Sequence, residues 1–147
     1  MCNKVGQSPT NESVSLETPS VASTAKGAGM AVKGLGIDLC EIARMQRLLE
    51  ENRPLRRMFT AAEEAYIRSK HAAAAQTMAG LFAAKEAVLK AIGTGMSVAM
   101  TDIVISHTEL GQPIATLTGK AAEFGGTVMI SISHEAGMAA AFAVWMA

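Results

Sequence analysis

An alanine-rich stretch from about residue 72 to residue 92 constrains the fold most strongly, because it predicts one long helix. Alanine has the highest helix propensity of all residues, and Gly80 is the only helix breaker inside the stretch. Gly93 follows the last apolar residue and is placed to end the helix in a left-handed conformation. We therefore expect a long helix that dominates the domain.

A lysine interrupts the apolar stripe of this helix. At about 100° per residue, one apolar arc is expected on the helix, and Lys85 projects between Leu89 and Ile92 of that arc. The ordinary interpretation of such a residue is an aliphatic stem that packs against its neighbours while the ammonium group reaches water. Glu86 and Lys90 lie on the adjacent edge of the helix, four residues apart, where they would form an ordinary solvated pair.

The elements before this helix are a strand and two shorter helices. Residues 32–39, "VKGLGIDL", have the length and composition of a buried strand, and they deliver Asp38 near its end. Residues 41–51 carry apolar side chains at helical spacing, which indicates an amphipathic helix. Thr60 and Glu63 form a capping box, so a second helix begins there.

The C-terminal part of the chain reads as four strands. The segments "TDIVISH", "IATLT", "TVMISIS" and "GMAAAFAVWM" are short and apolar, and a small helix is expected from about residue 119. A strand, then helices, then mainly strands indicates the α+β class, with the long helix packed on a small antiparallel sheet arranged as a meander.

Composition separates a tail from a single domain. Residues 1–30 are rich in Ser, Thr, Gly and Pro and are predicted to be a disordered N-terminal extension, whereas residues 31–147 have enough apolar residues for one domain. Lys plus Arg and Asp plus Glu number 13 each, so bulk charge favours no nucleic-acid partner. The sequence shows neither a membrane span nor a signal peptide, and its two cysteines form no CxxC pair. We expect a cytoplasmic protein.

Two familiar motifs are incomplete. "GLGIDL" resembles the start of a dinucleotide-binding fingerprint, but the position of the third glycine holds Leu39. The three histidines, His71, His107 and His134, lack the spacing of zinc ligands. What remains is chemistry built from carboxylates and lysine: if the fold brings Asp38 near Glu86, two carboxylates with water and substrate phosphates suit Mg²⁺.

Four segments in order resemble a known family. "GLGIDLCEIAR", "FTAAEEAY", "FAAKEAVLKAIGTG" and "ISISHE" together are similar to the holo-[acyl-carrier-protein] synthases, the small bacterial class of 4′-phosphopantetheinyl transferases. The resemblance covers about residues 31–147. It implies transfer of the phosphopantetheine arm of coenzyme A to a serine of acyl carrier protein, with adenosine 3′,5′-bisphosphate as the second product, in fatty acid and lipid biosynthesis.

The resemblance also implies roles for individual residues. Asp38, Glu86 and Lys90 correspond to catalytic residues, of which Asp38 and Glu86 should hold Mg²⁺ on the pyrophosphate of coenzyme A. Lys90 should reach the same phosphates as a point charge, and Gly93 should let the backbone approach the ligand. Lys85 is expected to contact coenzyme A, because an ammonium group removed from water needs phosphate oxygens or a neighbouring carboxylate as its partner.

Partners follow from the same resemblance. Arg44 lies in a locally basic segment and is expected to pair with acidic residues of the acyl carrier protein. His134, at the end of an alternating strand, is expected either near the nucleotide phosphates or at the rim beside Glu135. The resemblance implies a homotrimer with sites between subunits, and we expect Asp38 and His134 from one subunit, with Glu86 and Lys90 from its neighbour.

One departure from the family pattern leaves a second function class open. The family often has a basic residue directly before "FAAKE", where this chain has Leu81. A phosphate contact is therefore expected to be missing, and nucleotide affinity is expected to be lower than is typical of the family. The alternative to a transferase is a module that binds carrier protein but has lost the chemistry.

Overall fold

The computed structural model describes residues 29–95 and 97–147, so the extension predicted for residues 1–30 lies almost entirely outside the described residues. Within them the order of elements is as follows: β1 Val32–Glu41, α1 Ile42–Glu50, α2 Ala61–Ser69, η1 His71–Ala73, α3 Ala74–Ile92, η2 Met100–Asp102, β2 Ile103–His107, β3 Pro113–Leu117, η3 Gly119–Phe124, β4 Thr127–Glu135 and β5 Met138–Met146. The α+β class is confirmed.

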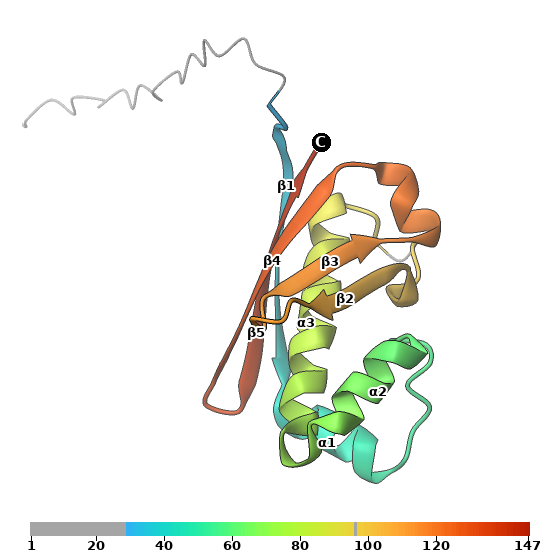
Figure 1. Cartoon of the computed structure of the whole chain (residues 1–147), viewed down its shortest axis with the longest axis vertical. Coiled ribbons are helices and arrows are strands. Elements are labelled where there is room, and N and C mark those ends of the chain that lie inside the picture. Colours follow the sequence, from blue (N-terminus) through green and yellow to red (C-terminus); the bar gives the residue numbers. More distant parts are fainter. Residues whose placement is uncertain (1–28, 96) are drawn as a thin grey trace, which may run out of the picture.

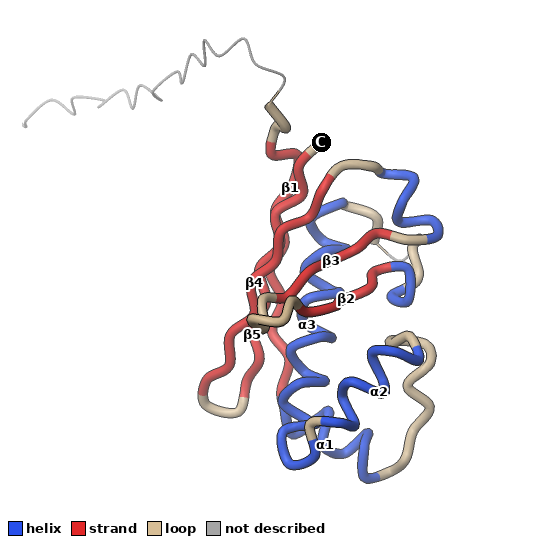
Figure 2. Tube along the Cα trace, viewed as in Figure 1, coloured by secondary structure: helices blue, strands red, loops and turns tan. Residues whose placement is uncertain are grey.

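The strands form two sheets around α3. A three-stranded antiparallel sheet has the order β1-β5-β4, and β2 pairs with β3 in a separate hairpin. Figure 2 shows β1, β4 and β5 side by side along α3, with α1 and α2 gathered near the beginning of that helix. The predicted meander is wrong, because the β2–β3 hairpin is separate from the sheet that contains β4 and β5. In that sheet the last strand, β5, pairs with the first strand of the chain, β1.

The ends of the helices follow the local signals. The Thr60 side chain accepts a hydrogen bond from the backbone N–H of Glu63, and the Glu63 carboxylate accepts one from the Thr60 N–H, which confirms the capping box. Helix α3 ends at Gly93, whose φ of 71° lies in the left-handed region. Among the helices in the described residues, none combines the length and the apolar character needed to span a bilayer.

Strand β1 lies unusually close to α3. An ideal Cβ on Gly36 would stand 1.9 Å from the backbone oxygen of Ala87, and one on Gly34 would stand 1.9 Å from that of Ala91. No side chain fits there, so the glycines of "GLGID" allow a strand backbone to rest directly on a helix backbone. The glycines therefore set the distance between the strand that carries Asp38 and the helix that it faces.

The prediction that β1 is a buried strand is wrong for one of its faces. Leu35, Ile37 and Leu39 are 60–62% exposed, because they alternate with the residues that face α3. In the sheet register, Ile37 stands opposite Phe142. Leu35 of β1 and Met129 of β4 both stand opposite Val144 of β5, so they lie on the same face of the sheet. We call these five exposed side chains, Leu35, Ile37, Leu39, Met129 and Phe142, the outer sheet face.

Candidate active site

Asp38 and Lys90 meet within one chain. The Lys90 Nζ donates hydrogen bonds to Asp38 Oδ1 at 2.7 Å and to the backbone oxygen of Ile37 at 2.9 Å. The Asp38 side chain is only 16% exposed, whereas that of Lys90 is 51% exposed. The expectation that different subunits supply these two residues is therefore wrong: the close packing of β1 on α3 places the acid at the end of the strand directly against the helix.

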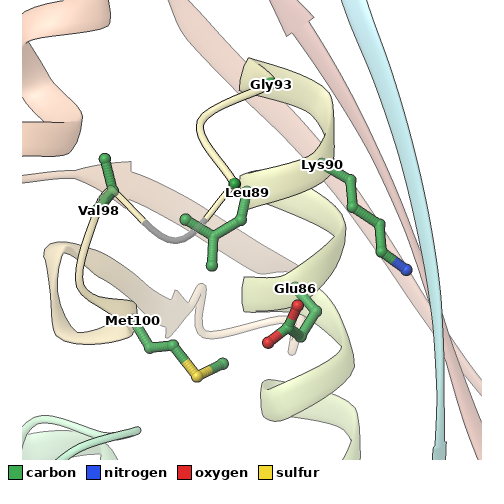
Figure 3. Close-up of a pocket in the computed structure, with 7 residues that line it drawn as sticks. Glu86, Leu89, Lys90, Gly93, Val98 and Met100 are labelled. Carbon is green, nitrogen blue, oxygen red and sulfur yellow. The ribbon is translucent and has the colours of Figure 1, made fainter.

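Glu86 lies one turn before Lys90 and lines a cavity with it. This cavity, which we call the Glu86 cavity, has a volume of about 530 Å³. Figure 3 shows Glu86 and Lys90 projecting from α3, with Met100 across the space from Glu86. Its lining is Glu86, Leu89, Lys90, Gly93, Gly95, Val98 and Met100. The predicted site residues Glu86, Lys90 and Gly93 are therefore brought together, and Asp38 is joined to them through Lys90.

The donor set fits Mg²⁺ bound with a substrate. Mg²⁺ takes one or two protein carboxylates and completes its octahedron with water and phosphate oxygens. Asp38 Oδ2 and both oxygens of Glu86 accept no hydrogen bond from the described residues, and both side chains are partly exposed. The described residues hold no cluster of three or more acidic, histidine or cysteine ligands. Asp38, which contacts Lys90, and Glu86, which lines the cavity with Lys90, each keep carboxylate oxygen available for a metal that arrives with phosphates.

Lys85 lies in the core, paired with Glu63. Its Nζ donates to Glu63 Oε2 at 2.7 Å and to the backbone oxygen of Met100 at 3.1 Å, and the side chain is 0% exposed. Burial lowers the pKa of Lys85, while the hydrogen bond and the charge of Glu63 oppose that shift. Of the two partners considered for this ammonium group, the structure shows the carboxylate. The predicted contact of Lys85 with coenzyme A does not suit an ammonium group that is fully enclosed and already paired with Glu63.

His134 lines a second cavity on the other side of α3. This second cavity, which we call the His134 cavity, has a volume of about 240 Å³ and is also lined by Tyr66, Gly80, Leu81 and His107. Leu81 and Lys90 are nine residues apart, about 180° around the helix, so the two cavities lie on opposite sides of it. Within one chain, His134 therefore lies on the opposite side of α3 from Glu86 and Lys90.

The ring of His134 has an unused polar atom. Its Nε2 is buried and has no hydrogen-bond partner in the described residues, and an ideal Cβ on Gly80 would stand 2.9 Å from it. The alternative that placed this histidine beside Glu135 therefore gains no support from the contacts. In the same cavity, Tyr66 and His107 stack with ring centroids 4.6 Å apart. Burial, and secondarily the charge of Lys70, lowers the pKa of His107.

Arg44 lies apart from both cavities, on α1. Its side chain is exposed, and the guanidinium carbon stands 5.3 Å from the centre of the Phe82 ring. A guanidinium group over an aromatic face is held by a cation–π interaction while its N–H groups stay available. This position leaves Arg44 accessible to a partner protein.

Sequence reasoning missed the second role of Glu63. A capping-box glutamate is usually an exposed residue of the first helical turn, but here Glu63 is 3% exposed and also accepts a hydrogen bond from the backbone N–H of Ile105 at 2.8 Å. The sequence feature that indicates a buried carboxylate is Lys85 itself, since a lysine in an apolar stripe needs an anion as its partner. The identity of that anion depends on a contact 22 residues away in the chain, which no local pattern specifies.

Comparisons with known proteins agree with this architecture. The model of the 4′-phosphopantetheinyl transferase superfamily matches residues 34–142. A holo-[acyl-carrier-protein] synthase from Trichlorobacter lovleyi is 39% identical over 119 residues, which cover 75% of this chain and 94% of that protein. One from Clostridium acetobutylicum is 41% identical over 120 residues, covering 77% of this chain and 96% of that protein.

Solved structures show the same fold. A holo-(acyl-carrier-protein) synthase from Bacillus anthracis, crystallised in complex with CoA (3′,5′-ADP), is 32% identical with a TM-score of 0.68, covering 81% of this chain and 99% of that chain. The Helicobacter pylori holo-[acyl-carrier-protein] synthase in complex with coenzyme A is 31% identical with a TM-score of 0.67, covering 77% and 99%. The chain belongs to the 4′-phosphopantetheinyl transferase superfamily.

Proposed function

We propose that this protein transfers the 4′-phosphopantetheine group of coenzyme A to a serine of apo acyl carrier protein, giving holo carrier protein and adenosine 3′,5′-bisphosphate. The observation that carries the proposal is that Lys90 contacts Asp38 and lines the cavity with Glu86, in a chain whose relatives are holo-[acyl-carrier-protein] synthases. We call Asp38, Glu86 and Lys90 together the rim. The reaction belongs to fatty acid biosynthesis, and we expect it in the cytoplasm.

The rim supplies what a phosphoryl transfer needs. Asp38 and Glu86 would hold Mg²⁺, which supplies positive charge to the pyrophosphate when bound. The Lys90 ammonium, kept in place by Asp38, donates to phosphate oxygens whose charge grows in the transition state. The serine oxygen forms a bond to the phosphorus of the arm, the bond from that phosphorus to the bridging oxygen breaks, the hydroxyl proton passes to solvent, and adenosine 3′,5′-bisphosphate leaves.

One mass measurement tests this function. The purified protein is incubated with apo carrier protein, coenzyme A and Mg²⁺, and the carrier is expected to gain the mass of one phosphopantetheine group. A module that kept the fold but lost the chemistry would bind the carrier without consuming coenzyme A. An unmodified carrier after incubation with excess protein would contradict the transferase.

We also propose that the working form is a homotrimer. The outer sheet face leaves five large apolar side chains exposed across three strands, which is unusual for an isolated chain. The His134 cavity and the Glu86 cavity lie on opposite sides of α3, so one ligand can use both only if they come from neighbouring chains. A second copy on the outer sheet face would cover the apolar side chains.

Ile37→Asp is expected to convert the assembly to monomers. A carboxylate in the middle of the outer sheet face would be buried without a partner in any interface built on it. The measurement is the molar mass in sedimentation. Thr116→Asp, at an exposed position of the other sheet, is the control and should leave the mass unchanged. A trimer that persists in Ile37→Asp would exclude this face as the interface.

Arg44→Glu is expected to slow carrier modification with little change in coenzyme A affinity. Reversal of an exposed charge acts mainly on the encounter with a partner of opposite charge, and rim charges of this kind change association rates about tenfold or more. The measurement is kcat/KM for the carrier and, separately, for coenzyme A. Arg53→Glu, at another exposed arginine of the basic segment, is the control. Equal losses for both substrates would contradict the partner role of Arg44.

A further inference from the structure

The buried pair of Lys85 and Glu63 connects four elements of the fold. Glu63 is in the first turn of α2, Lys85 is in α3, and the second hydrogen bond of Lys85 reaches Met100 in η2. Through its other oxygen, Glu63 accepts from the backbone of Ile105 in β2. The pair also lies beside Phe59, whose ring centre is 5.4 Å from Nζ. The ammonium group is thus enclosed, and each of its two hydrogen bonds has a defined direction.

Stability alone is a weak reason for such a pair. Taking two charges out of water is costly, and apolar side chains of the same volume often stabilise a core as well or better. A leucine at position 85 would complete the apolar stripe of α3. The distinguishing contact of the lysine is therefore the one that leucine cannot make, the hydrogen bond to the backbone oxygen of Met100 at 3.1 Å.

That oxygen belongs to a wall of the Glu86 cavity. Val98 and Met100 line the cavity on the side across from α3, and with Leu89 of that helix they belong to the apolar core and its margin. Apolar contacts have no preferred direction, so they allow the wall to slide. Among the side-chain hydrogen bonds of the described residues, the one that ties α3 to this wall comes from Lys85. Lys85 directly precedes Glu86, so the hydrogen bond to Met100 starts from the same turn of the helix as Glu86.

We propose that Lys85 is a positioning residue, which sets the separation between the Met100 wall and Glu86 and thereby the fit of the donor substrate. The inference rests on the proposed function, because the donor is coenzyme A. Lys85 acts through the wall and does not touch the substrate. Loss of the hydrogen bond is expected to weaken coenzyme A binding while the chemistry at Asp38, Glu86 and Lys90 continues.

Lys85→Met is the direct test. This variant keeps an unbranched side chain one heavy atom shorter and removes the donor to Met100. The KM for coenzyme A is expected to rise about tenfold, the effect of losing one hydrogen bond to a charged group. The kcat is expected to change less than threefold, roughly the scatter of such contributions. Calorimetry of coenzyme A binding in the presence of Mg²⁺ and without carrier gives a second reading that requires no turnover.

Two further variants separate positioning from plain destabilisation. Ile67→Ala removes buried volume from α2 without touching the wall and is the matched control for lost stability. The double variant Glu63→Gln/Lys85→Met removes both charges together, so it remains testable if Lys85→Met alone does not fold. Positioning predicts the weakened coenzyme A binding in both Lys85 variants and not in Ile67→Ala. Unchanged binding in the Lys85 variants, or an equal loss in Ile67→Ala, would overturn the inference.

The two proposals fail in different ways. A wild-type protein that binds coenzyme A but modifies no carrier would contradict the proposed transfer and leave the binding test of Lys85 intact. A wild-type protein that modifies the carrier, together with a Lys85→Met variant that binds coenzyme A equally well, would overturn only the positioning role.

Discussion

Glu86→Gln is expected to lower the kcat of carrier modification by a factor of about 10²–10³, the usual cost of removing one preorganised electrostatic group from an active site. Glutamine keeps the volume of the side chain and removes the charge that would hold Mg²⁺ against the pyrophosphate. Glu86 is half-buried and accepts no hydrogen bond from the described residues, so the substitution leaves the packing of α3 unchanged. The measurement is the rate of phosphopantetheine transfer at saturating coenzyme A and Mg²⁺.

The control for this result is a glutamate far from the rim. Glu109→Gln removes the same charge at an exposed position between β2 and β3 and should transfer at the wild-type rate. Thermal unfolding of both variants should match the wild type. Turnover near the wild-type rate in Glu86→Gln would remove this carboxylate from the mechanism, whereas a large loss of Tm would make the activity result structural.

Gly36→Ala is expected to destabilise the protein by about 3 kcal/mol, near the upper end for overpacked sites. The added Cβ would stand 1.9 Å from the backbone oxygen of Ala87 and 2.8 Å from the backbone nitrogen of Ala91, and neither atom can rotate away. Strand β1 must therefore move from α3. Since Asp38 is two residues further along the strand, its 2.7 Å contact with Lys90 should open as well. The Tm is expected to fall by roughly 10 °C.

Lys33→Ala is the matched control for Gly36→Ala. It lies on the same strand, is exposed, and should leave the Tm within about 2 °C of the wild type, as is usual for surface substitutions. Transfer activity measured below the transition adds a second reading, because a displaced Asp38 lowers activity even in the folded fraction. A Tm for Gly36→Ala equal to that of the control would mean that strand and helix separate without cost.

Local signals in the sequence predict the elements well. The capping box at Thr60 and Glu63, the left-handed end at Gly93 and the positions of the strands depend on residues within a few positions of one another. The α+β class with a long helix on a small antiparallel sheet follows from their order. Asp38, Glu86 and Lys90 were recognised from short motifs, and the structure brings Glu86 and Lys90 into one cavity.

The remaining features depend on contacts between distant segments. The pairing of β1 with β5 joins opposite ends of the domain, and strand composition does not specify such a partner. In the run 32–39, Leu35, Ile37 and Leu39 share one face and the two glycines share the other, so periodicity would assign the leucine face to the core. Only the close packing against α3 puts the glycine face inside. The meeting of Asp38 with Lys90 in one chain, like that of Lys85 with Glu63, follows from tertiary packing alone.

The alanine-rich surface of α3 has a consequence for how neighbouring sites communicate. Because seven of the 19 residues of this helix are alanine and another is glycine, the body between the Glu86 cavity and the His134 cavity is thin and has few side-chain rotamers to absorb a displacement. In an assembly of the kind proposed, one helix would serve as a shared, stiff partition between two reaction centres. A substitution that tilts this helix would change the shape of both cavities, so the activity of one reaction centre could not be altered without affecting the other.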